Sequence, residues 1–155
     1  MPYKKNKKID NLIAQFKINI KSEKYYFHMY LWENKESMML NAPDDVKGSD
    51  SEAMAALATS IIKIHSDGTE SDEIIYPKLG EIHFIKDRWD MNIVAHELMH
   101  IMIHKIRMVG PEFEKIIYQD ENAEEETCYL FGDWVSEVYL KLWEVNPSMK
   151  WCKAL

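Results

Sequence analysis

Two histidines and a glutamate in the second half of the chain have the residue types and the spacing of a metal-dependent hydrolytic site. They lie in the segment His96-Glu97-Leu98-Met99-His100. In a helix, residues four apart project from one face, one turn apart, so both imidazoles can reach a single Zn²⁺ at about 2.0–2.1 Å. Glu97 is directed to the side of this pair, where a carboxylate can accept a proton from metal-bound water instead of coordinating the metal. The pattern predicts that His96 and His100 are zinc ligands and that Glu97 is a general base.

The helix that carries this motif is predicted to be buried. Most other directions around it are occupied by apolar residues, namely Val94, Ala95, Leu98, Met99, Ile101, Met102 and Ile103. A helix that is apolar nearly all round belongs inside a protein, and an ionisable cluster there needs partners because isolated buried charges are costly. The alternative is a chance occurrence of the motif on a purely structural helix. We prefer the metal interpretation because the helix directly follows a predicted strand.

His104 continues the same ladder of histidines. In a straight helix it lies about 12 Å from His96, which is too far to share one metal ion. The residues from Leu98 to His104 include no glycine that could turn the chain. We therefore expect His104 to be packed, or to act through one of the ligands.

A third zinc ligand is expected downstream, because a catalytic zinc generally takes three protein ligands and leaves one position for water. The best source is an acidic run made of Asp120, Glu121, Glu124, Glu125 and Glu126. Most of these carboxylates suit the N-terminus of a helix, where they interact favourably with the helix dipole. Glu125 is the first candidate for the ligand, and Glu121 and Glu124 remain open.

These residues carry a family resemblance. His96-Glu97-x-x-His100 followed by Glu125-x-x-Cys128-x-x-Phe131-Gly132 resembles the gluzincin pattern of zinc metallopeptidases. More narrowly, residues 79–84 together with the acidic segment resemble short HExxH proteins of phages and mobile elements. The resemblance covers residues 79–134, and it implies that His96, His100 and Glu125 bind zinc and that Glu97 is the general base.

The resemblance also raises expectations for residues around the site, and one of them departs from the family. Gluzincins commonly place an Asp four residues after the ligand Glu, and this chain has Tyr129 there, so Glu121 or Asp133 is left to orient a ligand.

Gly132 is either a point of close approach to the active-site helix or a merely tolerated glycine. The oxyanion donor is open among Tyr118, Tyr129 and His104. In the family the substrate peptide pairs with an edge strand that precedes the helix, a role expected here for residues 80–86.

The elements that position the site are predicted to be strands first and helices last, which indicates an α+β fold. Strands are expected at residues 16–20, 25–32, 37–40 and 81–86 and in the second half of residues 53–65, whose alanines alone would favour helix. The strand at residues 25–32 is apolar or aromatic on both faces and should be central. Helices are expected at residues 90–108, 112–118 and 122–145, the first capped by Asp90. The resemblance makes this a zincin-like arrangement, an N-terminal antiparallel or mixed sheet packed against an active-site helix and a glutamate helix.

Composition limits the classes of protein that fit. The 155 residues predict one domain, residues 1–155, with residues 1–10 a flexible basic tail. A net charge of −7 argues against nucleic acid as a partner. The two cysteines, Cys128 and Cys152, are too few for a disulfide framework and suggest free thiols in a reducing compartment. No signal peptide or membrane span is visible, so we expect a cytoplasmic protein without a membrane partner.

The sequence therefore predicts a zinc-dependent hydrolase, a peptidase acting on peptide or protein substrates. The alternative is a non-catalytic, zinc-stabilised protein-binding or regulatory module, against which the presence of Glu97 argues, because a structural site needs no base beside its ligands. A metal hydrolase of non-peptide amides is a weaker third hypothesis.

Overall fold

The computed structural model describes residues 11–19, 25–41, 52–57, 61–64, 66–75, 78–108 and 121–147. The predicted tail at residues 1–10 and the predicted helix at residues 112–118 lie outside these ranges. The helices and strands in chain order are β1 (Leu12–Ile18), β2 (Tyr26–Trp32), α1 (Lys35–Leu40), β3 (Ala53–Leu57), β4 (Ile61–Ile64), β5 (Glu70–Ile75), β6 (Lys78–Ile85), α2 (Met91–Met108) and α4 (Glu121–Val145).

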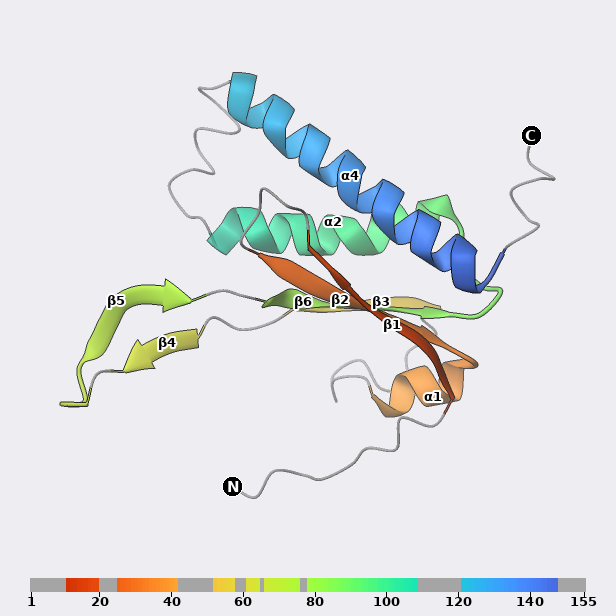
Figure 1. Ribbon diagram of the computed structural model, residues 1–155, viewed down its shortest axis with the longest axis horizontal. Helices are drawn as coiled ribbons and strands as arrows, with labels where there is room; N and C mark the ends of the chain where they lie inside the picture. Colours follow the sequence, from red (N-terminus) through yellow and green to blue (C-terminus); the bar gives the residue numbers. More distant parts are fainter. Residues whose placement is uncertain are drawn as a thin grey trace.

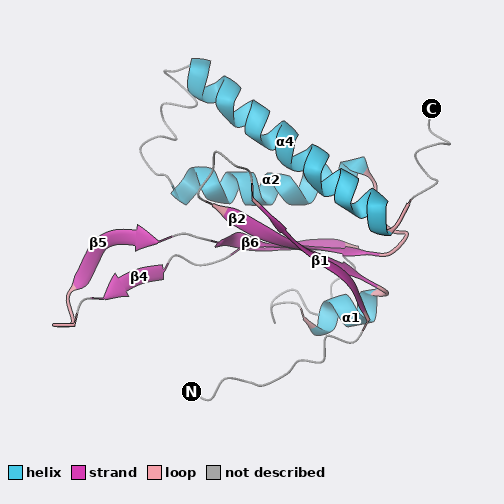
Figure 2. Ribbon diagram, in the orientation of Figure 1, coloured by secondary structure: helices cyan, strands magenta, loops and turns pink. Residues whose placement is uncertain are grey.

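A four-stranded mixed sheet forms the centre of the fold. The strand order is β1-β2-β6-β3, with β2 parallel to β6 and the outer two pairs antiparallel. Figure 1 shows α2 and α4 lying across one face of this sheet and α1 lying against the other, while β4 and β5 form a separate hairpin. The α+β architecture is confirmed, and colouring by type shows the sheet and the helices as separate layers (Figure 2).

The central position predicted for the strand at residues 25–32 is confirmed. In β2 the side chains of Phe27, Met29 and Leu31 are fully buried beneath the two long helices. The intervening side chains project from the opposite face, as the alternation of a strand requires. The ring of Trp134 from α4 packs edge-on against Phe27, with their centroids 5.2 Å apart. The aromatic strand is therefore the floor of the core on which α2 and α4 rest.

One predicted element is wrong in type, and one ambiguous segment is decided by the structure. Residues 37–40, expected as a strand, belong to the helix α1, because Asn34 caps it by accepting a hydrogen bond from the Ser37 amide at 2.9 Å. The alanine-rich first half of residues 53–65, where the sequence left helix and strand open, is the strand β3, and the strand expected in the second half is β4. Pairing with β6 and packing against α2 override the helix propensity of its alanines.

A buried asparagine joins the end of α4 to the start of α2. The Asn146 side chain is 6% exposed, and its Oδ1 accepts hydrogen bonds from the Asp87 amide and from Trp89 Nε1, both at 2.8 Å. Its Nδ2 donates to Asp87 Oδ1. Asp90 then caps α2 as predicted, accepting from the Ile93 amide at 2.8 Å. These contacts fix where the helix with the HExxH motif begins.

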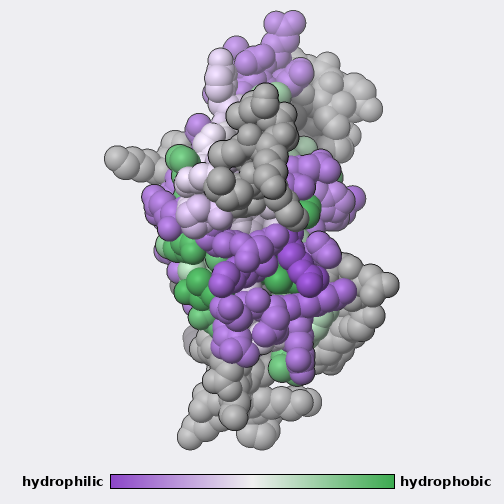
Figure 3. All heavy atoms as spheres, turned by 90° about the vertical axis from the view of Figure 1, so that its right-hand side faces the viewer, coloured by the Kyte–Doolittle hydropathy of each residue, from purple (hydrophilic) through white to green (hydrophobic). Residues whose placement is uncertain are grey.

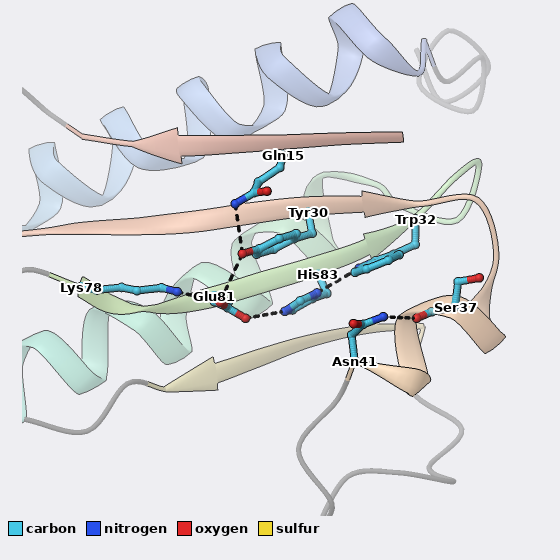
Figure 4. A network of polar contacts seen from close by, with 8 residues as sticks. All are labelled: Gln15, Tyr30, Trp32, Ser37, Asn41, Lys78, Glu81 and His83. Atoms are coloured by element: carbon cyan, nitrogen blue, oxygen red, sulfur yellow. Dashed lines mark hydrogen bonds and ion pairs between the residues drawn. The ribbon is translucent and has the colours of Figure 1, made fainter. Parts of the chain in front are cut away.

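A polar network covers the sheet face that α2 and α4 leave open (Figure 4). The buried His83 ring accepts a hydrogen bond from Trp32 Nε1 at Nδ1, so its proton lies on Nε2, which donates to Glu81 at 3.2 Å. Lys78 and Tyr30 also bind the Glu81 carboxylate, and the Tyr30 ring stacks on His83 at 4.6 Å. The hydrogen bond from His83, helped by Lys78, lowers the pKa of Glu81 to about 2 against the opposing effect of burial. Burial and the nearby Glu81 charge raise the pKa of Tyr30 to about 12.

This network predicts a pH-dependent contribution to stability. Because folding lowers the pKa of Glu81 from 4.5 to about 2, its carboxylate stabilises the fold above pH 4.5, and this stabilisation is lost as the pH falls towards 2. We expect Glu81→Gln to reduce the free energy of unfolding by about 2–3 kcal/mol near pH 6. In urea unfolding experiments the difference from wild type should shrink between pH 4.5 and 2. Glu144→Gln, which removes an exposed carboxylate of α4, is the control, and a constant difference across the pH range would contradict the assignment.

One end of the molecule presents a mostly polar surface. Figure 3 views the end of the molecule at which α2 begins, where hydrophilic residues predominate and hydrophobic ones form small groups. Cys128 is an exposed free thiol, whereas Cys152 lies outside the described ranges. Among the helices described, none combines the length and apolar character required to traverse a bilayer.

Candidate metal centre

The two histidines of the motif lie side by side on α2. The centroids of the His96 and His100 rings are 5.1 Å apart, and the planes meet at 77°. Both side chains are exposed, whereas Val94, Leu98 and Ile101 on the opposite side of the helix are fully buried against the sheet. The apolar residues thus fix the rotation of α2, and that rotation presents the imidazole pair to solvent. The prediction of a helix buried on nearly all sides is wrong for this face, since Met99 and Ile103 are also about two-fifths exposed.

Glu97 lies beside this pair but is directed into the protein. Its side chain belongs to a residue that is only 7% exposed. Burial raises the pKa of the Glu97 carboxyl, and the nearby His96 acts in the opposite direction. No group of the described residues forms a hydrogen bond with it. The enclosed side-chain atom without a hydrogen-bond partner among the described residues is His28 Nδ1, so the Glu97 oxygens keep some access to solvent, and a partly enclosed carboxyl with a raised pKa is a candidate functional group.

A pocket of about 250 Å³ opens next to the motif, between the first turns of α2 and the start of β3. It is lined by Glu52, Ala53, Asn92, Ile93, His96 and Glu97. Sequence reasoning missed Glu52 and Asn92. The position of Asn92 could have been found, because it lies one helical turn before His96 on the same face. Nothing in the local pattern identifies Glu52, which is brought to the site only by the pairing of β3 with β6.

The structure does not bring the predicted third ligand to the histidine pair. Glu125 is exposed on α4 and lies nine positions before the buried Trp134, which at 100° per residue places it on the opposite side of that helix. Glu121 and Glu124 are exposed as well. No set of three His, Cys, Asp or Glu side chains within the described ranges is arranged to hold a metal ion. Assignment of the third ligand stays a prediction.

The other residues expected near the site are placed as follows. His104 is half-buried and has an interaction partner of its own. Tyr129 is 71% exposed, and Tyr118 lies outside the described ranges. Asp133, considered as an orienting residue, is exposed. None of these positions identifies an oxyanion donor.

The prediction that residues 80–86 form an edge strand is wrong. The strand at residues 80–86 corresponds to β6, which lies between β2 and β3 and so has both edges paired. The edge strand of the described sheet that packs against α2 is β3. The error has a physical cause, since β3 is short and rich in alanine and gives a weak strand pattern.

Two glycines near these elements have opposite environments. A Cβ atom at Gly80 would overlap with the backbone oxygen of Ala56 and approach Ile101 Cδ1 to 3.2 Å, whereas a Cβ at Gly132 would have no atom within 4 Å. The interpretation of Gly132 as a point of close approach is therefore wrong. Close approach occurs at Gly80, where β3, β6 and α2 meet.

These environments predict stability changes of opposite sign. Gly80→Ala should lower the free energy of unfolding by about 2–3 kcal/mol, because β3 must move away from β6. Gly132→Ala should raise it by about 0.5–1 kcal/mol, because alanine favours the helical backbone and meets no obstacle. Urea unfolding of both variants at one pH provides the comparison. A neutral Gly80→Ala would mean that β3 is not held at this register.

Comparisons of the chain with protein-family models, with curated proteins and with solved structures found no match. The function is therefore inferred from the chain's own residues and their arrangement.

Proposed function

We propose that this protein is a zinc-dependent hydrolase, and specifically a zincin-like peptidase. The observation that carries the proposal is the combination on α2 of two adjacent, exposed imidazoles with a mostly buried carboxyl between them in sequence, beside an open pocket that this carboxyl helps to line. Metal-based hydrolysis needs this set of groups, namely neutral nitrogen ligands and a base that does not itself coordinate.

The histidine pair fits zinc as two of its ligands. Imidazole nitrogens are preferred zinc ligands, and rings whose centroids are 5.1 Å apart on one helix face can converge on one ion. A third protein ligand is absent from the described arrangement, and Glu125 remains the proposed residue from the gluzincin resemblance. When bound, zinc would supply Lewis-acid activation of water and of the scissile carbonyl.

The chain's own residues supply proton transfer and substrate binding. The Glu97 carboxylate would accept the proton of the attacking water and later donate it to the leaving amine. Burial raises the pKa of the Glu97 carboxyl, which favours a group that first accepts a proton and then donates it. Asn92, which lines the pocket beside His96, can donate its amide hydrogens to a substrate carbonyl.

Binding of a peptide backbone is proposed for β3. A strand at the edge of a sheet has unpaired backbone groups, and an extended peptide can add to it as a further strand. The β3 strand begins at the pocket, since Ala53 is both its first residue and part of the pocket wall. A peptide paired with β3 would pass directly in front of His96 and Glu97.

Removal of the metal tests the proposal. We expect the purified chain to contain about one zinc ion and to cleave casein or an internally quenched peptide library. Treatment with a zinc chelator should reduce cleavage by at least about a hundredfold, and addition of zinc should restore it. The metal content is measured in the same samples. Cleavage that persists after the zinc has been removed would contradict the proposal, as would a fully zinc-loaded chain that cleaves no peptide.

A further inference from the structure

The pocket beside the HExxH motif is lined by both apolar and polar residues. Ala53 and Ile93 provide apolar walls, Asn92 an amide and Glu52 a carboxylate, and His96 and Glu97 of the motif complete the lining. At about 250 Å³ the pocket is smaller than the roughly 300–1,000 Å³ typical of sites for whole small molecules. It is therefore of a size suited to one side chain of a larger ligand.

Glu52 is available to bind a ligand. The carboxylate contacts Arg88 at 3.6 Å, and the two side chains are 53% and 52% exposed. An ion pair this exposed contributes little to stability, so a ligand cation can replace Arg88 at modest cost. Arg88 itself is not part of the pocket wall.

The walls and the carboxylate together match the chemistry of a lysine or arginine side chain. Such side chains bury an aliphatic stem against apolar surface and keep the charged end at a polar partner. Ala53 and Ile93 suit the stem, and Glu52 suits the charged end. The chain's net charge of −7 also favours the approach of a cationic peptide over an acidic one.

We propose that this pocket binds a positively charged side chain of the substrate and that Glu52 is the specificity-determining residue. The inference rests on the proposed function in treating the occupant as a substrate. It adds a substrate class, namely peptides with a basic residue next to the scissile bond.

Binding of three matched peptides tests the inference. Fluorescently labelled five-residue peptides of alanine carry a central lysine, norleucine or glutamate, so the first two share an aliphatic stem and differ in charge. Fluorescence anisotropy is measured with the zinc-loaded chain carrying Glu97→Gln, which keeps the peptides intact. We expect the lysine peptide to bind about tenfold more tightly than the norleucine peptide, and the glutamate peptide to bind most weakly.

Substitutions of Glu52 assign the preference to one residue. Glu52→Gln should remove the tenfold advantage of the lysine peptide and leave norleucine binding unchanged, and Glu52→Arg should reverse the order of lysine and glutamate. Glu36→Gln, an exposed glutamate of α1 on the other side of the sheet, should change nothing. Equal binding of the lysine and norleucine peptides, or a lysine preference that survives Glu52→Gln, would overturn the inference.

Hydrolysis by the chain with Glu97 intact separates this inference from the proposed function. Quenched versions of the same peptides should be cleaved with the same order of preference. If the lysine peptide binds in a manner that depends on Glu52 but no peptide is cleaved by the zinc-loaded chain, the pocket assignment stands and the hydrolase assignment is wrong. If cleavage occurs without any dependence on Glu52, the hydrolase assignment stands and the inference is wrong.

Discussion

Glu97→Gln is expected to bind zinc as the wild-type chain does and to cleave peptides at least about a thousandfold more slowly. Glutamine has the shape of glutamate but cannot accept a proton from water. The side chain does not occupy a ligand position in the proposed site, so the metal content should be unchanged. The zinc content and the initial rate of cleavage of an internally quenched peptide are measured on the same preparation.

The same substitution should not destabilise the zinc-free fold. Glu97 is 7% exposed and forms no hydrogen bond with another described residue that its replacement would break, and burial raises its pKa. A neutral amide at this position removes the cost of burying a charge, so the free energy of unfolding should stay equal or rise by on the order of 1 kcal/mol. A variant that is stable and inactive would identify a residue retained for catalysis.

Two other outcomes would change the interpretation. Cleavage at the wild-type rate by Glu97→Gln would mean that another group is the base. A wild-type chain that binds zinc and cleaves nothing, with its biological activity unaffected by Glu97→Gln, would favour the alternative of a zinc-stabilised binding or regulatory module.

The local part of the site could be predicted from the sequence because one helix contains it. The spacing of His96 and His100, the cap at Asp90 and the apolar residues around them fix both the helix and the face on which the rings lie. The same is true of β2, whose alternation of buried and half-buried residues is a property of the strand alone. Periodic patterns of this kind are local, and they hold in most tertiary contexts.

The parts of the fold and of the site that the sequence did not predict depend mostly on contacts between segments far apart in the chain. Glu52 reaches the pocket because β3 pairs with β6, and β3 itself is a strand because of that pairing and not because of its alanines. The short helix α1 is an exception, because its caps at Asn34 and Asn41 are local and the sequence pattern could have revealed them. The relation of Glu125 to the histidine pair depends on how α2 and α4 are connected and packed, which no spacing within either helix determines.

Substituting the proposed zinc ligands one at a time tests the histidine pair on α2 separately from a third ligand on α4. His96→Ala and His100→Ala should each weaken zinc binding by at least about a hundredfold, because even loss of a residue that only supports a ligand costs about 10–100-fold. Competition of each variant with a fluorescent zinc chelator gives the affinity. Ile103→Ala is the control on the same helix, and it should retain zinc because this exposed apolar side chain has no atom that can bind the ion. Stoichiometric zinc in His96→Ala would contradict the site.

Glu125→Ala then tests whether α4 completes the site. A loss of affinity as large as that caused by His96→Ala would show that the carboxylate reaches the ion in the loaded protein, although Glu125 lies on the exposed side of α4 in the described structure. In that case zinc binding must rotate or shift the N-terminal turns of α4, where the side chains of Glu121, Glu124 and Glu125 are all exposed and so free of tight packing. Unchanged zinc affinity would exclude Glu125, and the same measurement on Glu121→Ala and Glu124→Ala would follow. The histidine pair requires only α2, whereas a third ligand on α4 would make zinc binding depend on how the two helices pack, so these variants should also differ in how far zinc raises their thermal stability.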